Sequence, residues 1–94
     1  MDLGRIFVRN ESIVYREEED GAFLFDPDTG NLKYMNRTAK EAFLLLDGRT
    51  DVNQVIQHLS TLYPDVDMQQ IQRDALSYLQ QLEENGFISL PPME

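Results

Sequence analysis

The sequence contains no cysteine, and its only histidine is His58. Disulfides, thiolate zinc sites and a cysteine nucleophile are therefore excluded, and a single copy cannot supply a three-histidine zinc site. No stretch approaches the roughly 18 consecutive apolar residues that mark a membrane-spanning helix. The first residues also lack the apolar run of a signal peptide. These absences favour a cytoplasmic protein that neither enters nor crosses a membrane.

Basic residues are scarce: 8 Lys and Arg stand against 17 Asp and Glu, for a formal net charge of −9. After residue 50, Arg73 is the only basic residue. Binding to DNA or RNA draws much of its affinity from Lys and Arg placed at phosphates. The second half of the chain is thus a poor match for nucleic acid, which we do not expect as a partner.

The 94 residues suffice for one domain, and 41% of them are hydrophobic, which is enough for a packed core. No linker, repeat or low-complexity stretch divides the chain. We expect a single domain over residues 1–94, with a core over 13–88 and frayed ends at 1–5 and 90–94.

The first third of the sequence predicts three strands, at 13–15, 22–25 and 32–35, from short runs of β-branched and aromatic residues. The segments between them are short and contain Pro27 and Gly30, which favour turns. Connections this short join antiparallel neighbours, so the strands should form a meander. Residues 6–8 are expected either to add a short strand or to pack across the sheet.

The remainder predicts three helices, because apolar residues recur at intervals of three and four positions. The expected start and stop residues are Asn36 or Thr38 to Gly48, Thr50 or Asp51 to Pro64, and Asp67 to Asn85 and Gly86. The predicted architecture is an α+β fold resembling a winged helix-turn-helix, with the meander followed by three helices.

The sequence contains no convincing set of catalytic residues. The four acids at 17–20 fall in one predicted hairpin loop, where they would share a solvated environment rather than the contrasting environments that acid–base catalysis needs. Asp26, Asp28 and Gly30 match only the start of a calcium-binding loop. His58 has no nucleophile in a recognisable motif. We expect neither an enzyme nor a bound cofactor or metal.

A winged helix also raises the possibility of a transcriptional regulator. In a DNA reader the recognition helix carries Arg and Lys, whereas the helix expected at 67–85 has only Arg73 among four acids. A regulator, or a protein-interaction adaptor that does not bind a peptide strand, remains the alternative to the function developed below.

The third predicted strand offers an edge for interaction. Residues 31–36 contain no proline and one charge, Lys33, so they lack the usual features that keep a sheet edge from pairing. An extended peptide could add there as a further strand. The chain's own N-terminus or a dimer partner could equally cover this edge, and we expect a monomer or a weak homodimer.

Several short motifs, in order and spacing, resemble the PqqD-like family over residues 13–88. They are the segment 20–26, Thr29-Gly30, Met35-Asn36 where the family usually has Leu-Asn, Leu46-Asp47-Gly48 with Thr50, and Leu79, Leu82, Gly86, Phe87 and Ile88. The resemblance implies a leader-peptide-binding chaperone, also called a RiPP recognition element, which presents a precursor peptide to a modifying enzyme. That enzyme is often a radical S-adenosylmethionine (radical SAM/SPASM) protein, in pyrroloquinoline quinone (PQQ) synthesis or a related pathway.

The resemblance also implies where the peptide lies: along the third strand, against the helix at 67–85. The implied peptide-binding residues are Leu32, Lys33, Tyr34, Met35, Asn36, Asp74, Leu76, Tyr78 and Gln81. A period of about 100° per residue puts Leu76 on one flank of that helix and Tyr78 and Gln81 on the other. The choice between the flanks stays open, as does the alternative that Tyr78 only closes the edge of the core.

Overall fold

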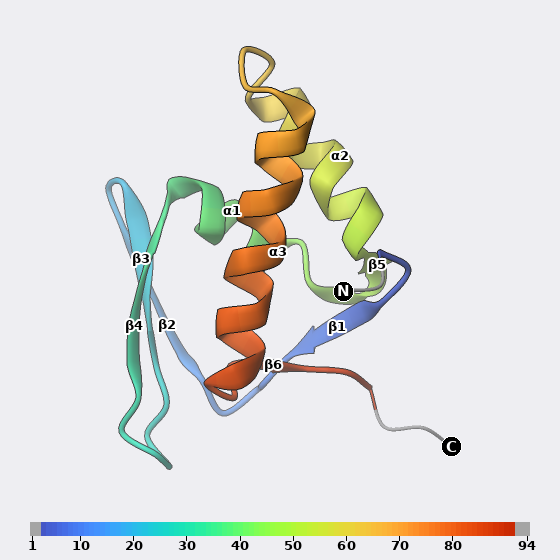
Figure 1. Ribbon diagram of the computed structural model, residues 1–94. Helices are drawn as coiled ribbons and strands as arrows, with labels where there is room; N and C mark the ends of the chain where they lie inside the picture. The colour runs from blue at the N-terminus through green and yellow to red at the C-terminus, as the bar shows by residue number, and fades with distance from the viewer. Residues whose placement is uncertain (1–2, 92–94) are drawn as a thin grey trace.

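The computed structural model describes residues 3–91, which form two small sheets and three helices (Figure 1). The elements in chain order are β1 (Ile6–Arg9), β2 (Val14–Glu18), β3 (Gly21–Phe25), β4 (Leu32–Asn36), α1 (Arg37–Leu44), β5 (Asp47–Asp51), α2 (Val52–Leu62), α3 (Met68–Glu84) and β6 (Ile88–Ser89). None of these helices, within the described part of the chain, is long and apolar enough to cross a membrane. The predicted α+β fold is confirmed.

The predicted meander is present as an antiparallel sheet of order β2-β3-β4. A two-residue turn joins Glu18 to Gly21, which are paired across the β2–β3 hairpin. In the β3–β4 loop, Asp26 is 5% exposed and its carboxylate accepts the Asp28 N–H at 2.9 Å. Gly30 takes a φ of 81°, which is accessible to glycine, and donates its N–H to the Asp26 carbonyl. The Asp-x-Asp-x-Gly segment is therefore a hairpin turn.

A second sheet, of order β5-β1-β6, was not predicted beyond the possibility of a strand near residues 6–8. β1 pairs antiparallel with β5 through Ile6 and Asp51, and with β6 through Arg9 and Ile88. Gly48, expected to end the first helix, lies instead within β5 at a φ of 82°. The polar composition of β5 concealed it, because Asp47–Asp51 reads as a turn and a helix cap.

The N-cap of α3 agrees with the prediction, and for α1 and α2 the structure decides between the two predicted alternatives. Asn36, not Thr38, caps α1, and Asp51, not Thr50, caps α2 in a reciprocal capping box with Gln54. α1 ends at Leu44, earlier than the expected stop at Gly48. α3 runs from the Asp67 cap to Asn85, as expected.

The core lies where α1, α2 and α3 meet the inner face of the meander and the second sheet. Its largest fully buried side chains are Phe7, Leu24, Met35, Leu46, Val52, Val55, Leu59, Leu79, Leu82, Phe87 and Ile88. Two members of the predicted helical stripes, Leu62 and Met68, are instead 45% and 46% exposed. They lie at the end of α2 and the start of α3, beside the 63–67 loop, where no described element covers them.

The expectation of a frayed N-terminus does not hold for residues 3–5. The carbonyl groups of Leu3 and Arg5 accept the N–H groups of Asn53 and Val52, each at 2.9 Å. These are N–H groups of the first turn of α2, which have no partner within the helix. Residues 1–2 and 92–94 of the expected frayed ends lie outside the described residues.

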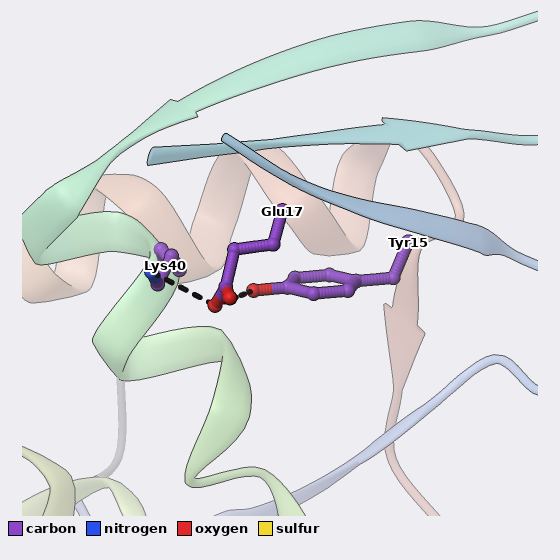
Figure 2. A network of polar contacts seen from close by, with 3 residues as sticks. All are labelled: Tyr15, Glu17 and Lys40. Carbon is purple, nitrogen blue, oxygen red and sulfur yellow. Dashed lines mark hydrogen bonds and ion pairs between the residues drawn. The ribbon is translucent and has the colours of Figure 1, made fainter. Parts of the chain in front are cut away.

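One charged contact ties the meander to α1, as Figure 2 shows. The Tyr15 hydroxyl donates to the Glu17 carboxylate at 3.3 Å, and the Lys40 ammonium lies 3.0 Å from the same carboxylate. The hydrogen bond and the charge of Lys40 lower the pKa of Glu17, and the same pair raises the pKa of Lys40. Burial, followed by the nearby Glu17 charge, raises the pKa of Tyr15. The four acids at 17–20 were expected to share one solvated loop. Glu17 instead belongs to strand β2 and contacts Tyr15 and Lys40.

This contact predicts a small pH-dependent loss of stability on the acidic side. The pKa of Glu17 is lower in the folded protein than its ordinary value of 4.5. The ionised carboxylate therefore contributes its full stabilisation of the folded state at pH values above 4.5. The contribution disappears as the pH falls further, through the pKa of the folded state. The urea midpoint of Glu17→Gln should therefore lie below that of the unaltered protein at pH 7, and the difference should shrink as the pH falls below 4.5. A difference that persists unchanged at pH 3 would contradict the assignment.

Candidate functional site

A pocket of about 220 Å³ lies between β4 and α3. It is lined by Lys33, Tyr34, Met35, Asn36, Ala39, Tyr78, Gln81 and Leu82. Met35, Ala39 and Leu82 are buried and supply apolar surface, while the polar ends of Lys33, Asn36 and Gln81 are accessible at its rim. We call this pocket and the strand edge beside it the β4–α3 groove. Its composition suits an extended ligand that inserts one apolar side chain.

Side-chain hydrogen bonds connect β4 and its preceding loop to α3 at three levels. The Asn31 amide donates to the Asn85 carbonyl at 3.3 Å. The Lys33 ammonium donates to Gln81 Oε1 at 2.6 Å, and the Asn36 amide donates to the Tyr78 hydroxyl at 3.2 Å. As the residue number rises along β4 it falls along α3, so the strand and helix run in opposite directions. The groove therefore has two walls held at a defined separation by side chains.

The hydrogen bonds of Asn36 explain why the Met-Asn motif has an asparagine at this position. Its Oδ1 accepts the Ala39 N–H at 2.9 Å and so caps α1, while its Nδ2 reaches the Tyr78 hydroxyl. An amide has both a donor and an acceptor, whereas an ionised aspartate has acceptors only and could not donate to the Tyr78 hydroxyl. One side chain thus fixes the end of β4, the start of α1 and one wall of the groove.

The outer edge of β4 is available for pairing. Within residues 3–91, β4 pairs only with β3, so the N–H and C=O groups of its other edge have no strand partner. Neither the N-terminal strand β1 nor any other described strand covers it, so within residues 3–91 the chain's own N-terminus does not pair with this edge. A bare edge beside a partly apolar pocket can accept an extended segment by main-chain hydrogen bonding.

The structure brings together six of the nine predicted site residues: Lys33, Tyr34, Met35, Asn36, Tyr78 and Gln81. Leu32 is 66% exposed and outside the pocket. Asp74 accepts a hydrogen bond from Gln70 a turn away, and Leu76 packs against the core, so neither lines the pocket. Tyr78 was expected either to contact the peptide or only to close the edge of the core. In the structure it lines the pocket and also packs against the core.

Two lining residues, Ala39 and Leu82, were not among the predicted site residues. Leu82 was recognisable only as part of the buried stripe of α3. Ala39 belongs to α1, and nothing in the spacing of β4 and α3 indicated that the first turn of α1 would form the pocket floor.

A larger pocket, of about 440 Å³, lies where β1, β2, α1 and β5 meet. Two of its charged groups already have partners within the protein. The Arg9 guanidinium lies 5.7 Å from the centre of the Phe43 ring, which stacks on Tyr15. The Asp47 carboxylate accepts the N–H groups of Arg49 and Thr50, which lower its pKa. Residues 3–91 contain no cluster of three potential metal ligands, and His58 is exposed on α2.

The comparison with protein families gives one match, over residues 21–88, to the family described as Coenzyme PQQ synthesis protein D (PqqD). The matched segment covers well over half of the sequence and includes both walls of the groove. The chain belongs to the PqqD family. The family resemblance predicted from the sequence motifs is thereby confirmed.

Two solved structures are similar to this PqqD family member over 92% of its length and 99% of their own. One is described as lasso peptide synthetase B1 complexed with the leader peptide, at 27% identity and a TM-score of 0.76. The other, TbiB1 in complex with the TbiA(beta) leader peptide, has 16% identity and a TM-score of 0.77, which supports the fold. The comparison with curated proteins gives no match.

Proposed function

We propose that this protein binds the leader segment of a ribosomally made precursor peptide and presents it to a modifying enzyme. The leader adds as a fourth strand at the outer edge of β4 and runs along the β4–α3 groove. The protein itself acts as a carrier, without catalysis. The observation that carries the proposal is the unpaired edge of β4 beside a pocket that has β4 and α3 as its walls.

Main-chain pairing and side-chain insertion have separate roles in this arrangement. Hydrogen bonds to the β4 backbone supply affinity for an extended segment whatever its sequence. The pocket over Met35, Ala39 and Leu82 takes an apolar side chain, with the Tyr78 ring as its wall. The membership of the PqqD family and the descriptions of the two similar structures as leader-peptide complexes support this choice of ligand.

We assign the receiving enzyme to the radical SAM/SPASM class, in PQQ synthesis or a related peptide-modifying pathway. The family description, Coenzyme PQQ synthesis protein D, supports the first of these pathways. A protein partner is also supported by the outer face of the meander. That face exposes Val14, Phe25, Leu32 and Tyr34 at 54%, 39%, 66% and 50%. Exposed apolar patches often mark protein contacts, and Val14, Phe25 and Leu32 of this patch lie outside the pocket of the groove.

The proposal predicts an alternating response to N-methylation of the leader. The probe is the leader segment encoded by a short reading frame next to the gene, synthesised with one N-methyl amide at a time. An added strand uses every second amide to pair with its neighbour. N-methylation at those positions should weaken binding at least tenfold, because it removes a donor and adds bulk at the edge, whereas methylation at the others should have little effect. Calorimetry measures the affinities.

The same peptides test location and delivery. Amide resonances of residues 32–36, Tyr78 and Gln81 should shift when the unmethylated leader is added, while Gln72 on the other flank of α3 should not. Full-length precursors carrying the disruptive N-methyl groups should also escape modification by the radical SAM enzyme encoded nearby. Binding without shifts in residues 32–36, or equal effects of every N-methyl group, would contradict strand addition.

A further inference from the structure

Lys33 is the one charged residue of β4, and no carboxylate partner lies within ion-pair distance of it. The ion pairs among residues 3–91 join Arg16 to Glu18 and Lys40 to Glu17. Lys33 instead donates to the neutral amide oxygen of Gln81 at 2.6 Å. Lys33 is thus a partly buried cation whose side-chain contact is with a neutral group, in a domain with a net charge of −9. It lies in the pocket that we assign to the peptide.

The side chain of Lys33 points into the groove. Its neighbours Leu32 and Tyr34 belong to the outer face, at 66% and 50% exposed, whereas Met35 is 1% exposed on the inner face. Side chains alternate between the faces of a strand, so Lys33 shares the inner face with Met35. Leu24, its cross-strand partner in β3, is fully buried on that face.

The groups around Lys33 fit an incoming carboxylate. An ammonium has three N–H donors, and the Gln81 oxygen accepts one of them. A carboxylate entering the groove can accept from Lys33 and, after rotation of the Gln81 amide, from its NH₂ group as well. Charge-assisted hydrogen bonds of this kind are about twice as strong as neutral ones. The acidic surface elsewhere repels an acidic peptide, so this attraction is confined to one position and fixes the register of the strand.

We infer that the groove selects leaders with an acidic residue two positions away from the apolar residue that fills the pocket. The inference rests on the proposed function and concerns the choice of peptide. Lys33 and Met35 are two residues apart on one face, and an added strand has the same two-residue period, so its inward side chains have the same spacing. The acid precedes or follows the apolar residue according to the strand direction.

A displayed library of random ten-residue peptides, selected on the immobilised protein, tests this without knowledge of the natural leader. We expect enriched peptides to carry Asp or Glu two positions from a large apolar residue, in one constant order. Replacing that acid by its amide in a selected peptide should weaken binding about fivefold, the difference expected between a hydrogen bond to a charged group and one to a neutral group. Lys33→Glu should shift the enrichment at that position to Lys or Arg.

Arg49→Glu is the matched control, because it changes the net charge equally and lies in the second sheet. It should leave the enriched pattern unchanged. If Lys33→Glu and Arg49→Glu shift the selection alike, or if enriched peptides contain the apolar residue without the acid, the inference is overturned while strand addition stands. If no peptide that shifts the amide resonances of residues 32–36 is enriched, the proposed function itself fails.

Discussion

Replacing Gly21 by alanine should destabilise the protein by about 3 kcal/mol, at the upper end of the range for overpacking substitutions. Gly21 is buried at the start of β3, opposite Asn36 at the end of β4. A Cβ atom there would overlap the carbonyl oxygen of Met35 and lie 3.0 Å from the Tyr34 hydroxyl. The first of these is a backbone atom of β4, which cannot rotate away as a side chain could. The strand must shift, and with it one wall of the groove.

Gly30→Ala is the comparison that separates this steric effect from backbone strain. Gly30 has a φ of 81°, but nothing lies within 4 Å of a Cβ placed there. Its substitution should cost about 1 kcal/mol, the penalty of a left-handed conformation for an L-residue. Urea unfolding measures both variants, and Gly21→Ala should in addition lose leader binding. Equal destabilisation of the two variants would show that β3 and β4 do not approach each other this closely.

The elements that the sequence predicts well are those whose cause is local. The meander follows from short apolar runs with turn residues between them, and α2 and α3 follow from their apolar periodicity and the caps at Asp51 and Asp67. These features lie within about 20 residues of one another along the chain. Local interactions of this kind leave their pattern in the sequence itself.

The second sheet shows the limit of that reasoning. β1 finds its partners about 40 and 80 residues away, in β5 and in the two-residue strand β6. The segment Asp47–Asp51 has no apolar alternation, because Asp47 folds back onto the N–H groups of Arg49 and Thr50 and Asp51 caps α2. Only the position of β1 in the folded protein makes this polar segment a strand.

The groove has the same mixture of local and non-local causes. The free edge at β4 was predictable, since it depends on the composition of residues 31–36. The flank of α3 that faces it was not, because a helical period gives angles around the helix axis but not the direction of the neighbouring strand. The contacts of Lys33 with Gln81 and of Asn36 with Tyr78 decide between the flanks. Leu76, predicted on the other flank, packs against the core instead.

Truncation of Tyr78 should produce the largest loss of peptide affinity among side chains of α3. Its ring forms a wall of the pocket and packs against the core, while its hydroxyl accepts from Asn36 at 3.2 Å. Aromatic side chains in such partly buried positions often dominate the affinity of an interface, with effects of about 2 kcal/mol or more. Tyr78→Ala should thus weaken leader binding about 30-fold, measured by calorimetry well below the unfolding temperature.

Three further substitutions identify which part of Tyr78 matters and whether the flank is correct. Tyr78→Phe keeps the ring and removes only the hydroxyl, so the affinity should fall less than about threefold, in line with the loss of one exposed hydrogen bond. Gln81→Ala and Gln72→Ala form a matched pair on opposite flanks of α3, and only Gln81→Ala should weaken binding. A larger effect at Gln72 than at Gln81, or full affinity in Tyr78→Ala, would mean that the peptide does not lie between β4 and this flank. Because all four variants leave the edge of β4 intact, an effect confined to Tyr78 and Gln81 is attributable to the groove wall and not to loss of the strand.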